Sequence, residues 1–521
     1  MKKTIKVFEK NKYVEKEVNY IPFRYIVAML LTIFEIVSII AIMVILAIYV
    51  PYFYVAIMIT VVGVVIQIIG SNENPDYKVP WLLFVITLPI VGLMLYFIFH
   101  QRKLPKRHFK MLKKLNNSLD YDDSKELELL KKDNELIYSQ IEQLKKVSGT
   151  HLYMNNNLSY FSSGEEMHRS ILEELEKANK FIFLEYFIIE EGIFWNSILE
   201  ILKRKVSEGI EVKVVYDDIG CMNTLPGNYF KQLRKKGIEA VLFSKLKGQA
   251  DGEFNNRSHR KILVIDGKVG FTGGVNIADE YINEKEVYGH WKDTGIKIIG
   301  PAVNELAKMF LSDYYINVKK EVQIDFSFYY SNYESKENNS YVIPFGDGPN
   351  PIYERQVGKT IIMNILNQAT KYVYITTPYL IIDNELMRCI ENTALRGIDV
   401  RIIVPHIPDK KVVFEMTKSN YEILIKSGVK IYEYTPGFIH SKMYISDDNL
   451  AMIGTINLDY RSLTHHFENG VVIYKDKCIE DMKKDFIDTM NESEYIDRDL
   501  GKDNLIKRFI KSIVRIFSPL L

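Results

Sequence analysis

Two eight-residue stretches decide the fold of this 521-residue chain: HRKILVID at residues 259–266 and HSKMYISD at residues 440–447. In each, a lysine follows the histidine by two positions and an aspartate follows it by seven. The agreement continues outward to a glycine and an asparagine, Gly273 and Asn276 in one copy and Gly454 and Asn457 in the other. The two other His-x-Lys triplets, at His108 and His290, lack the aspartate. The pair therefore indicates an internal duplication.

The sequence around the two stretches alternates between strand and helix patterns. The apolar runs FIFLEYF (residues 181–187) and VKVVY (212–216) each follow an amphipathic helical pattern. A similar order recurs around YVYITTP (372–378) and RIIVP (401–405). We therefore predict an α/β fold of two pseudo-twofold-related halves, residues 151–322 and 323–492, each a mixed sheet flanked by helices. The polar stretch 331–340 is the expected linker.

Composition narrows the function. The chain has 67 basic and 66 acidic residues, a net charge of +1, which argues against a general nucleic-acid binder. Its three cysteines lie far apart, at Cys221, Cys389 and Cys478, and suggest neither a disulfide framework nor a cysteine zinc site. We expect no metal and no other cofactor.

The first 103 residues are predicted to be a membrane segment. Apolar runs at 25–49, 52–69 and 80–99 are each long enough for about one span of 20 residues. We expect three spans, with two as the alternative. Lysines precede the first run and basic residues follow the last, and the positive-inside rule places both flanks in the cytoplasm. Three spans would put them on opposite sides, so the two expectations conflict.

Two further segments have amphipathic patterns. Residues 104–150 are expected to form charged helix in the lipid headgroup layer. Residues 493–521 alternate apolar and basic positions at helical spacing, which suits a helix lying on anionic lipid. Docking of this last helix on the protein core is the alternative.

The duplicated residue types suit reaction at a phosphate. On a strand, residues two apart share a face, so His259 with Lys261, and His440 with Lys442, can point into one pocket. The two lysines and the amides of Asn276 and Asn457 would bind a phosphate. One imidazole would attack phosphorus, and the other would protonate the leaving alcohol and then deprotonate the next one.

Each histidine also needs an acceptor to orient its ring. Asp293 and Glu468 begin equivalent strand patterns, one after each motif, and we assign them this role. Asp266 and Asp447 complete the duplicated motif and belong to its candidate catalytic set. Because each lies at the far end of its strand, we expect these two to act structurally, by fixing turns.

These residues resemble the phospholipase D superfamily, with its duplicated His-x-Lys-x4-Asp motif. The second copy, HSKMYISDDNLAMIGTINLDYRS (440–462), and the segment TTPYLIIDNEL (376–386) carry the resemblance most strongly. From about residue 52 onward the chain is similar to the bacterial cardiolipin synthases. The resemblance implies transfer between two phosphatidylglycerol molecules, giving cardiolipin and glycerol through a phosphohistidine, with His259 the favoured nucleophile. It implies a multi-pass protein of the bacterial cell membrane, with its catalytic part in the cytoplasm.

The resemblance leaves alternatives open. The first copy has Gly-Gly-Val-Asn where the second has Gly-Thr-Ile-Asn, so Thr455 is expected to bind phosphate in one half only. A phospholipase D that uses water, a transferase with another alcohol, a nuclease and a non-catalytic lipid-binding scaffold are the rival functions. We expect anionic lipid as the partner, no nucleic acid, and a complete site within one monomer.

Overall fold

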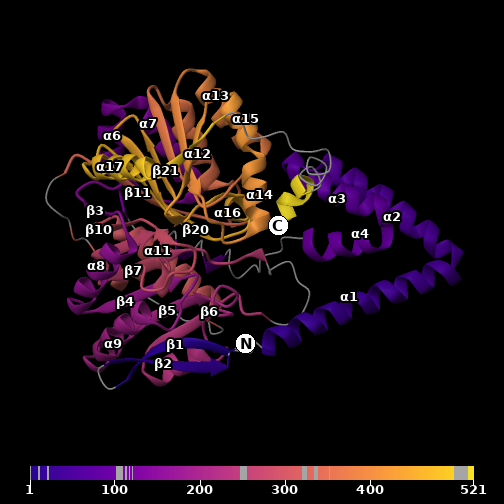
Figure 1. Cartoon of the computed structure of the whole chain (residues 1–521), viewed down its shortest axis with the longest axis horizontal. Coiled ribbons are helices and arrows are strands. Elements are labelled where there is room, and N and C mark those ends of the chain that lie inside the picture. The colour runs from indigo at the N-terminus through magenta and orange to yellow at the C-terminus, as the bar shows by residue number, and fades with distance from the viewer. Residues whose placement is uncertain are drawn as a thin grey trace.

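Two α/β halves and a group of apolar helices make up the molecule (Figure 1). A computed structural model describes residues 2–9, 12–19, 23–100, 110–111, 114–115, 118–119, 121–246, 255–318, 326–331, 333, 338–350, 352–497 and 514–520. The apolar helices project from one side of the two halves, and the chain begins with a hairpin of β1 (Lys2–Glu9) and β2 (Lys12–Asn19).

The first half is a seven-stranded mixed sheet. Its strand order is β3 (Asn157–Phe161), β10 (Gly295–Ile299), β8 (Val269–Gly273), β7 (Lys261–Ile265), β4 (Phe181–Tyr186), β5 (Glu211–Asp217), β6 (Glu239–Phe243). One face packs against α8 (Gly164–Glu176), α9 (Ile193–Ser207) and α10 (Tyr229–Lys235), and the other against α11 (Val303–Asn317). Alternate residues of β4 point into these two cores, as the period of a strand requires.

The second half repeats this plan with one extra edge strand. Its order is β11 (Tyr341–Asp347), β20 (Glu468–Tyr474), β18 (Leu450–Gly454), β17 (Met443–Ser446), β12 (Tyr372–Thr376), β14 (Asp399–Pro405), β15 (Lys430–Tyr434), β21 (Ser493–Ile496). The helices α12 (Val357–Gln368), α13 (Asn384–Leu395) and α15 (Tyr421–Lys426) cover one face, and α17 (Cys478–Asn491) covers the other. The predicted pair of related α/β halves is confirmed.

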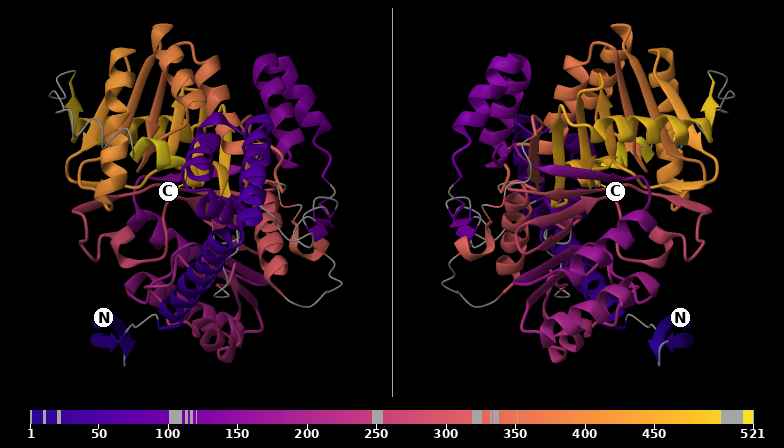
Figure 2. Two further views of the ribbon diagram at one scale, coloured as in Figure 1. Left: turned by 90° about the vertical axis from the view of Figure 1, so that its right-hand side faces the viewer. Right: turned by 90° about the vertical axis from the view of Figure 1, so that its left-hand side faces the viewer.

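The two halves share one core. Side chains of α11 from the first half and α17 from the second belong to a single apolar cluster that contains strands of both sheets. Figures 1 and 2 show the two sheets stacked, with α11 at the junction. Burial of this continuous core is the main term that fixes the halves against each other.

Among the described residues, two helices are apolar and long enough to cross a membrane, α1 (Phe23–Tyr49) and α2 (Pro51–Gly70). The predicted third span is instead three short pieces: α3 (Pro75–Thr87), α4 (Pro89–Leu95) and the π-helical turn η1 (Tyr96–His100). The break falls at Leu88, which has φ −129° and ψ 70°, and Pro89 supplies no N–H to continue the α3 ladder. The segment expected as a third span is therefore not one continuous helix, and the number of crossings, two or three, stays a prediction.

The linker helices contradict a second expectation. Residues 124–133 (α6, Ser124–Asp133) and 135–148 (α7, Glu135–Ser148) do not lie in a headgroup layer, because their apolar faces are buried in the core of the second half. An amphipathic pattern alone does not distinguish these two environments. The basic residues 102–109 and residues 498–513 of the expected C-terminal helix lie outside the described residues. Residues 493–496, where that helix was expected to begin, form the edge strand β21 instead. The described C-terminal end places Phe517 5.3 Å from Phe84 of α3.

Asp266 and Asp447 end the motif strands in equivalent turns. Both have positive φ, 55° and 53°, a conformation that aspartate tolerates better than most residues. The Asp266 carboxylate accepts hydrogen bonds from the backbone N–H of Asn179, Lys180 and Phe181, at 2.7–2.9 Å. Asp447 accepts the same three bonds at the start of β12, from residues 370–372. This geometry favours the structural role expected for both.

Replacing Asp266 with Ala should lower the free energy of unfolding by about 2–4 kcal/mol, because it leaves backbone donors without their charged acceptor. Asp447→Ala should behave alike. Chemical denaturation measures the loss, and turnover per folded molecule should stay near that of the unchanged protein. A variant that folds normally but does not turn over would contradict this assignment.

Candidate active site

Two short backbone contacts between the halves bring the motifs together. Ser258 forms a parallel bridge with Phe467, and the N–H of His259 donates to the Phe467 carbonyl at 2.8 Å. In the other copy, β16 (Gly437–Ile439) pairs with β9 (His290–Lys292), and the N–H of His440 donates to the Lys292 carbonyl at 2.7 Å. Each histidine therefore enters the site beside a segment of the opposite half.

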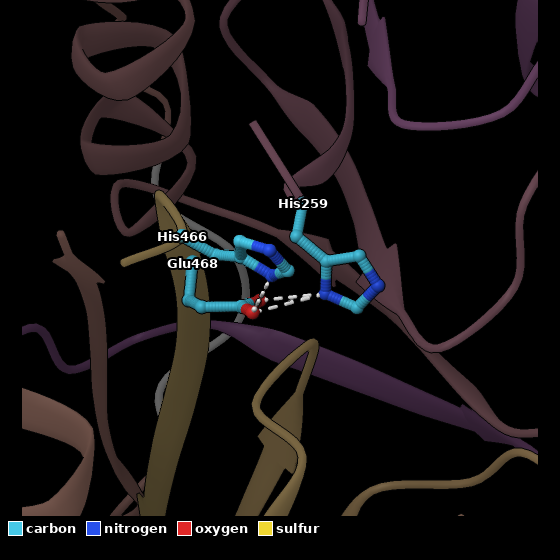
Figure 3. Close-up of side chains that lie close together, drawn as sticks. All are labelled: His259, His466 and Glu468. Carbon is cyan, nitrogen blue, oxygen red and sulfur yellow. Dashed lines mark hydrogen bonds and ion pairs between the residues drawn. The ribbon is translucent and has the colours of Figure 1, made fainter. Parts of the chain in front are cut away.

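The carboxylates that orient the histidines come from the opposite halves. His259 Nδ1 lies 2.9 and 3.0 Å from the two Glu468 oxygens (Figure 3), and His440 Nδ1 lies 2.7 Å from Asp293 Oδ2. All four side chains are buried. The two acids are those that the repeat predicted, but the repeat did not say which acid meets which histidine. Each pair crosses the interface because the acid follows directly after the residue that bridges to the other motif.

Both lysines point back toward their histidines. Lys261 Nζ donates to the His259 carbonyl at 2.7 Å, while Lys442 Nζ lies 2.8 Å from His440 Nδ1 and also contacts the His440 carbonyl. Burial, together with the charge of Lys442, lowers the pKa of Lys261 to about 7. Burial likewise lowers the pKa of Lys442 to about 8. The charge of Lys442 thus disfavours protonation of Lys261, and a bound anion would relieve that repulsion.

The two histidine–carboxylate pairs differ in charge. Burial lowers the pKa of His259 to about 3, although Glu468 opposes the shift. The contact with His259 outweighs burial and holds the pKa of Glu468 below its usual range, so this acid is ionised. Burial raises the pKa of Asp293 to about 7, and burial with the charge of Lys442 lowers that of His440. The site therefore holds one firmly charged carboxylate and one that titrates near neutrality.

The two copies differ at Gly274 and Thr455, and the difference between the acids Asp293 and Glu468 explains why. Thr455 is fully buried, and its hydroxyl donates to Glu468 and accepts the Asn469 N–H at 3.0 Å. Its hydroxyl is thus engaged behind the carboxylate, and a direct contact of Thr455 with phosphate stays a prediction. At the equivalent Gly274, a Cβ atom would lie 2.0 Å from Asp293 Oδ1, so the shorter acid leaves no room for a side chain.

The two asparagines are also unlike each other. Asn276 donates to the Tyr281 hydroxyl at 2.7 Å and accepts the Ile188 N–H at 3.2 Å, so its amide is already engaged. The Tyr281 ring in turn contacts the His440 ring, at 5.3 Å between centroids. Asn457 is buried, and its side-chain oxygen has no hydrogen-bond partner among the described residues. Of the two asparagines, Asn457 is therefore the one whose side-chain oxygen has no partner in the part of the chain that the structure describes.

Sequence reasoning missed His466. Its ring lies 5.6 Å from the His259 ring, and its Nδ1 is 3.6 Å from Glu468 Oε1 (Figure 3). Comparison of the two motif copies does not reveal His466, because the equivalent residue in the other half is Trp291. The Trp291 ring lies 5.6 Å from that of His440. The alternation of a strand could have found it, since residues 466 and 468 are two apart.

One group of side chains in the described part of the chain has the spacing of metal ligands. Ligand atoms of His259, His466 and Glu468 lie within 4.8 Å of one another. The buried Lys261 and Lys442 place positive charge beside this group, which favours an anion over a cation.

Comparison with known proteins identifies the family. The family described as "Cardiolipin synthase, PLD-like domain" matches residues 171–313 and 362–490, more than half of the chain. The family "Phospholipase_D-nuclease N-terminal" matches residues 56–100. The chain belongs to the cardiolipin synthase family. This membership makes it a phosphatidyltransferase of the phospholipase D superfamily that acts on phospholipids.

Curated relatives agree with this family. The chain is 35% identical over 396 residues to the cardiolipin synthase of Alkalihalophilus pseudofirmus, covering 73% of this chain and 78% of that one. It is 44% identical over 401 residues to an uncharacterized protein of Streptococcus mutans, covering 77% of this chain and 86% of the relative. The phosphatidylserine synthase of Haemophilus influenzae shares the fold, with 17% identity, a TM-score of 0.56, and coverage of 74% of this chain and 100% of that structure.

The low pKa of Lys261 predicts a pH-dependent decline in substrate capture. Below about pH 7 its amine is a cation that attracts phosphate, and above that pH it is neutral. The rate constant kcat/KM should therefore fall as pH rises through about 7, by at most about tenfold per pH unit. In Lys261→Arg this decline should move to higher pH, because arginine stays charged and Lys442, with a pKa of about 8, is then the lysine that titrates.

The exposed Lys268→Arg is the matched control and should keep the decline. Profiles of Lys261→Arg and the unchanged protein that superimpose would show that another group is responsible.

Proposed function

We propose that this chain is a cardiolipin synthase, which joins two phosphatidylglycerol molecules into cardiolipin and glycerol through a phosphohistidine. The observation that carries the proposal is the pair of crossed histidine–carboxylate contacts beside two buried lysines. Two oriented imidazoles suit one nucleophile and one proton donor. The lysines suit a phosphodiester held between them.

In the first step, Nε2 of His259 attacks the phosphorus of one lipid. The bond from phosphorus to the headgroup glycerol oxygen breaks, and His440 gives that oxygen a proton. In the second step, His440 takes a proton from a headgroup hydroxyl of another phosphatidylglycerol, whose oxygen attacks the phosphorus and releases His259. Protons and bonds balance over the two steps, and the enzyme returns to its starting state.

The hydrogen bonds favour His259 as the nucleophile. Glu468 is ionised and can only accept, so Nδ1 of His259 carries the proton and its Nε2 keeps a free lone pair. At His440, Lys442 Nζ lies within hydrogen-bond distance of Nδ1. To act as the proton donor, His440 must carry a proton on both ring nitrogens, with Nδ1–H donating to Asp293 and Nε2–H facing the leaving oxygen. An anionic phosphate between the lysines would raise the pKa of His440 and favour this role.

Membrane placement fits a lipid substrate. The apolar helices α1 and α2 support a multi-pass protein, and the basic residues at 102–114 support a catalytic part that faces the cytoplasm. Both halves of the site come from one chain, so a monomer is sufficient. Hydrolysis, or transfer to another alcohol, remains the second candidate, because the same groups would activate water.

Reconstitution into vesicles containing labelled phosphatidylglycerol tests this proposal. Cardiolipin should form, and His259→Ala or His440→Ala should reduce its formation by at least about 10³-fold. The control is His406→Ala, which removes a half-exposed histidine paired with Glu433 and should leave activity unchanged. Phosphatidic acid as the sole product would identify a hydrolase, and activity in either motif variant would refute the paired mechanism.

A phosphatidyl ester with a nitrophenol leaving group distinguishes the two histidines. Nitrophenol leaves without a proton donor, so His440→Asn should still form the covalent lipid adduct and, lacking its second base, accumulate it. His259→Asn should form none. Peptide mass mapping after a neutral quench should locate the adduct on His259. An adduct on His440 in the His259→Asn variant would reverse the assignment.

A further inference from the structure

The broken third apolar segment returns to the side from which it starts. In a continuous helix, the 19 positions from Trp81 to His100 would separate these residues by about 28 Å. Here the two rings lie 5.7 Å apart, and Trp81 also contacts Tyr96 at 5.8 Å. His100 Nε2 reaches to within 3.6 Å of Glu73, which precedes α3. The two ends of residues 75–100 are therefore neighbours.

The two arms of this segment are α3 and α4, and their backbones are in contact. A Cβ atom on Gly92 would lie 2.2 Å from the Phe84 carbonyl oxygen, so only glycine permits the contact. Leu88 and Pro89 form the reversal between the arms. The arm α3 has 13 residues and a length of about 20 Å, which is shorter than the hydrocarbon layer of about 30 Å.

The end of the segment where residues 72–77 and His100 lie side by side, opposite the reversal at Leu88, is here called the open end. It is polar and hydrogen-bonded to the second half. Asn74 Nδ2 donates to Asp383 at 2.7 Å, Asp76 accepts the Asn384 N–H at 2.8 Å, and the Tyr77 hydroxyl bonds to Thr464 at 2.9 Å. Both ends line a cleft of about 980 Å³ whose other wall is polar side chains of the second half. The open end therefore lies on the catalytic, aqueous side.

The opposite end, around the reversal at Leu88 and Pro89, is here called the closed end. Its side chains are apolar and exposed. Leu83, Ile86 and Leu88 are 39–58% exposed, whereas Trp81 and Val85 pack toward α2. This apolar face continues that of α1 and α2, the helices long enough to span, so lipid is the occupant that its chemistry fits.

We infer that residues 75–100 form a re-entrant helical hairpin, which enters the catalytic-side leaflet and leaves it on the same side. The chain then crosses the membrane twice, through α1 and α2, and both basic flanks lie on one side. This removes the conflict with the positive-inside rule that three spans create. The inference rests on the membrane placement proposed above and adds the path of the chain.

Single cysteines and a membrane-impermeant maleimide test the path in vesicles of uniform orientation. The three natural cysteines are buried, so the unchanged protein is the background control. Asn72→Cys and Lys125→Cys should react from one side, and Val50→Cys, between α1 and α2, from the other. Leu88→Cys should react from neither side until detergent is added. Labelling of positions 72 and 125 from opposite sides would overturn the inference.

A glycine pair tests the contact between the arms. Gly92→Leu should expose position 88 to the reagent or lower the unfolding midpoint, because its side chain collides with Phe84. Gly63→Leu on α2 is the matched control, since a Cβ there meets nothing within 4 Å. Unchanged labelling and midpoint in Gly92→Leu would contradict the hairpin.

Cardiolipin formation in the same vesicles separates the two proposals. Active vesicles with labels on opposite sides would refute only the hairpin. Inactive vesicles with the expected labels would refute only the function.

Discussion

The active site depends on two backbone hydrogen bonds between the halves, from the N–H of His259 to Phe467 and from the N–H of His440 to Lys292. Each carbonyl belongs to the residue just before an acid, so the bond that docks a motif also delivers the carboxylate to its histidine. Neither half alone supplies the carboxylate that orients its own motif histidine. The shared apolar core around α11 and α17 holds these contacts in register. Folding of the whole duplicated unit is therefore a condition for chemistry.

Duplication gives symmetry, but the proposed reaction needs two different histidines. The structure departs from symmetry at each position around the imidazoles. Glu468 has the Thr455 hydroxyl and His466 beside it, whereas Asp293 lies against Gly274 and its histidine against Trp291. The contacts of Glu468 with His259 and His466 hold its pKa below the usual range, whereas burial raises the pKa of Asp293 to about 7. A nucleophile and a proton donor can thus arise from copies of one motif.

The sequence predicted the two halves and the acids because both follow from local repeats. It could not predict the crossed pairing, since nothing in a strand pattern states which half supplies the partner. His466 was not predicted, because the equivalent residue in the other half is a tryptophan and the two copies therefore do not match at this position. Hydropathy gave a third span because it measures apolar length and not the reversal at Leu88. The amphipathic pattern of α6 and α7 fits lipid and protein equally, and here the partner is the second half's core.

A disulfide between the halves tests the crossed arrangement most directly. Thr294 follows Asp293, Ser441 follows His440, and their hydroxyl oxygens lie 2.7 Å apart. Cysteines at both positions should therefore form an intramolecular disulfide on mild oxidation, because the atoms that their sulfurs replace already lie in contact. Peptide mass mapping would identify the linked peptides, and each single variant would show none. Two free thiols in the folded double variant would contradict the crossed pairing and the active site built on it.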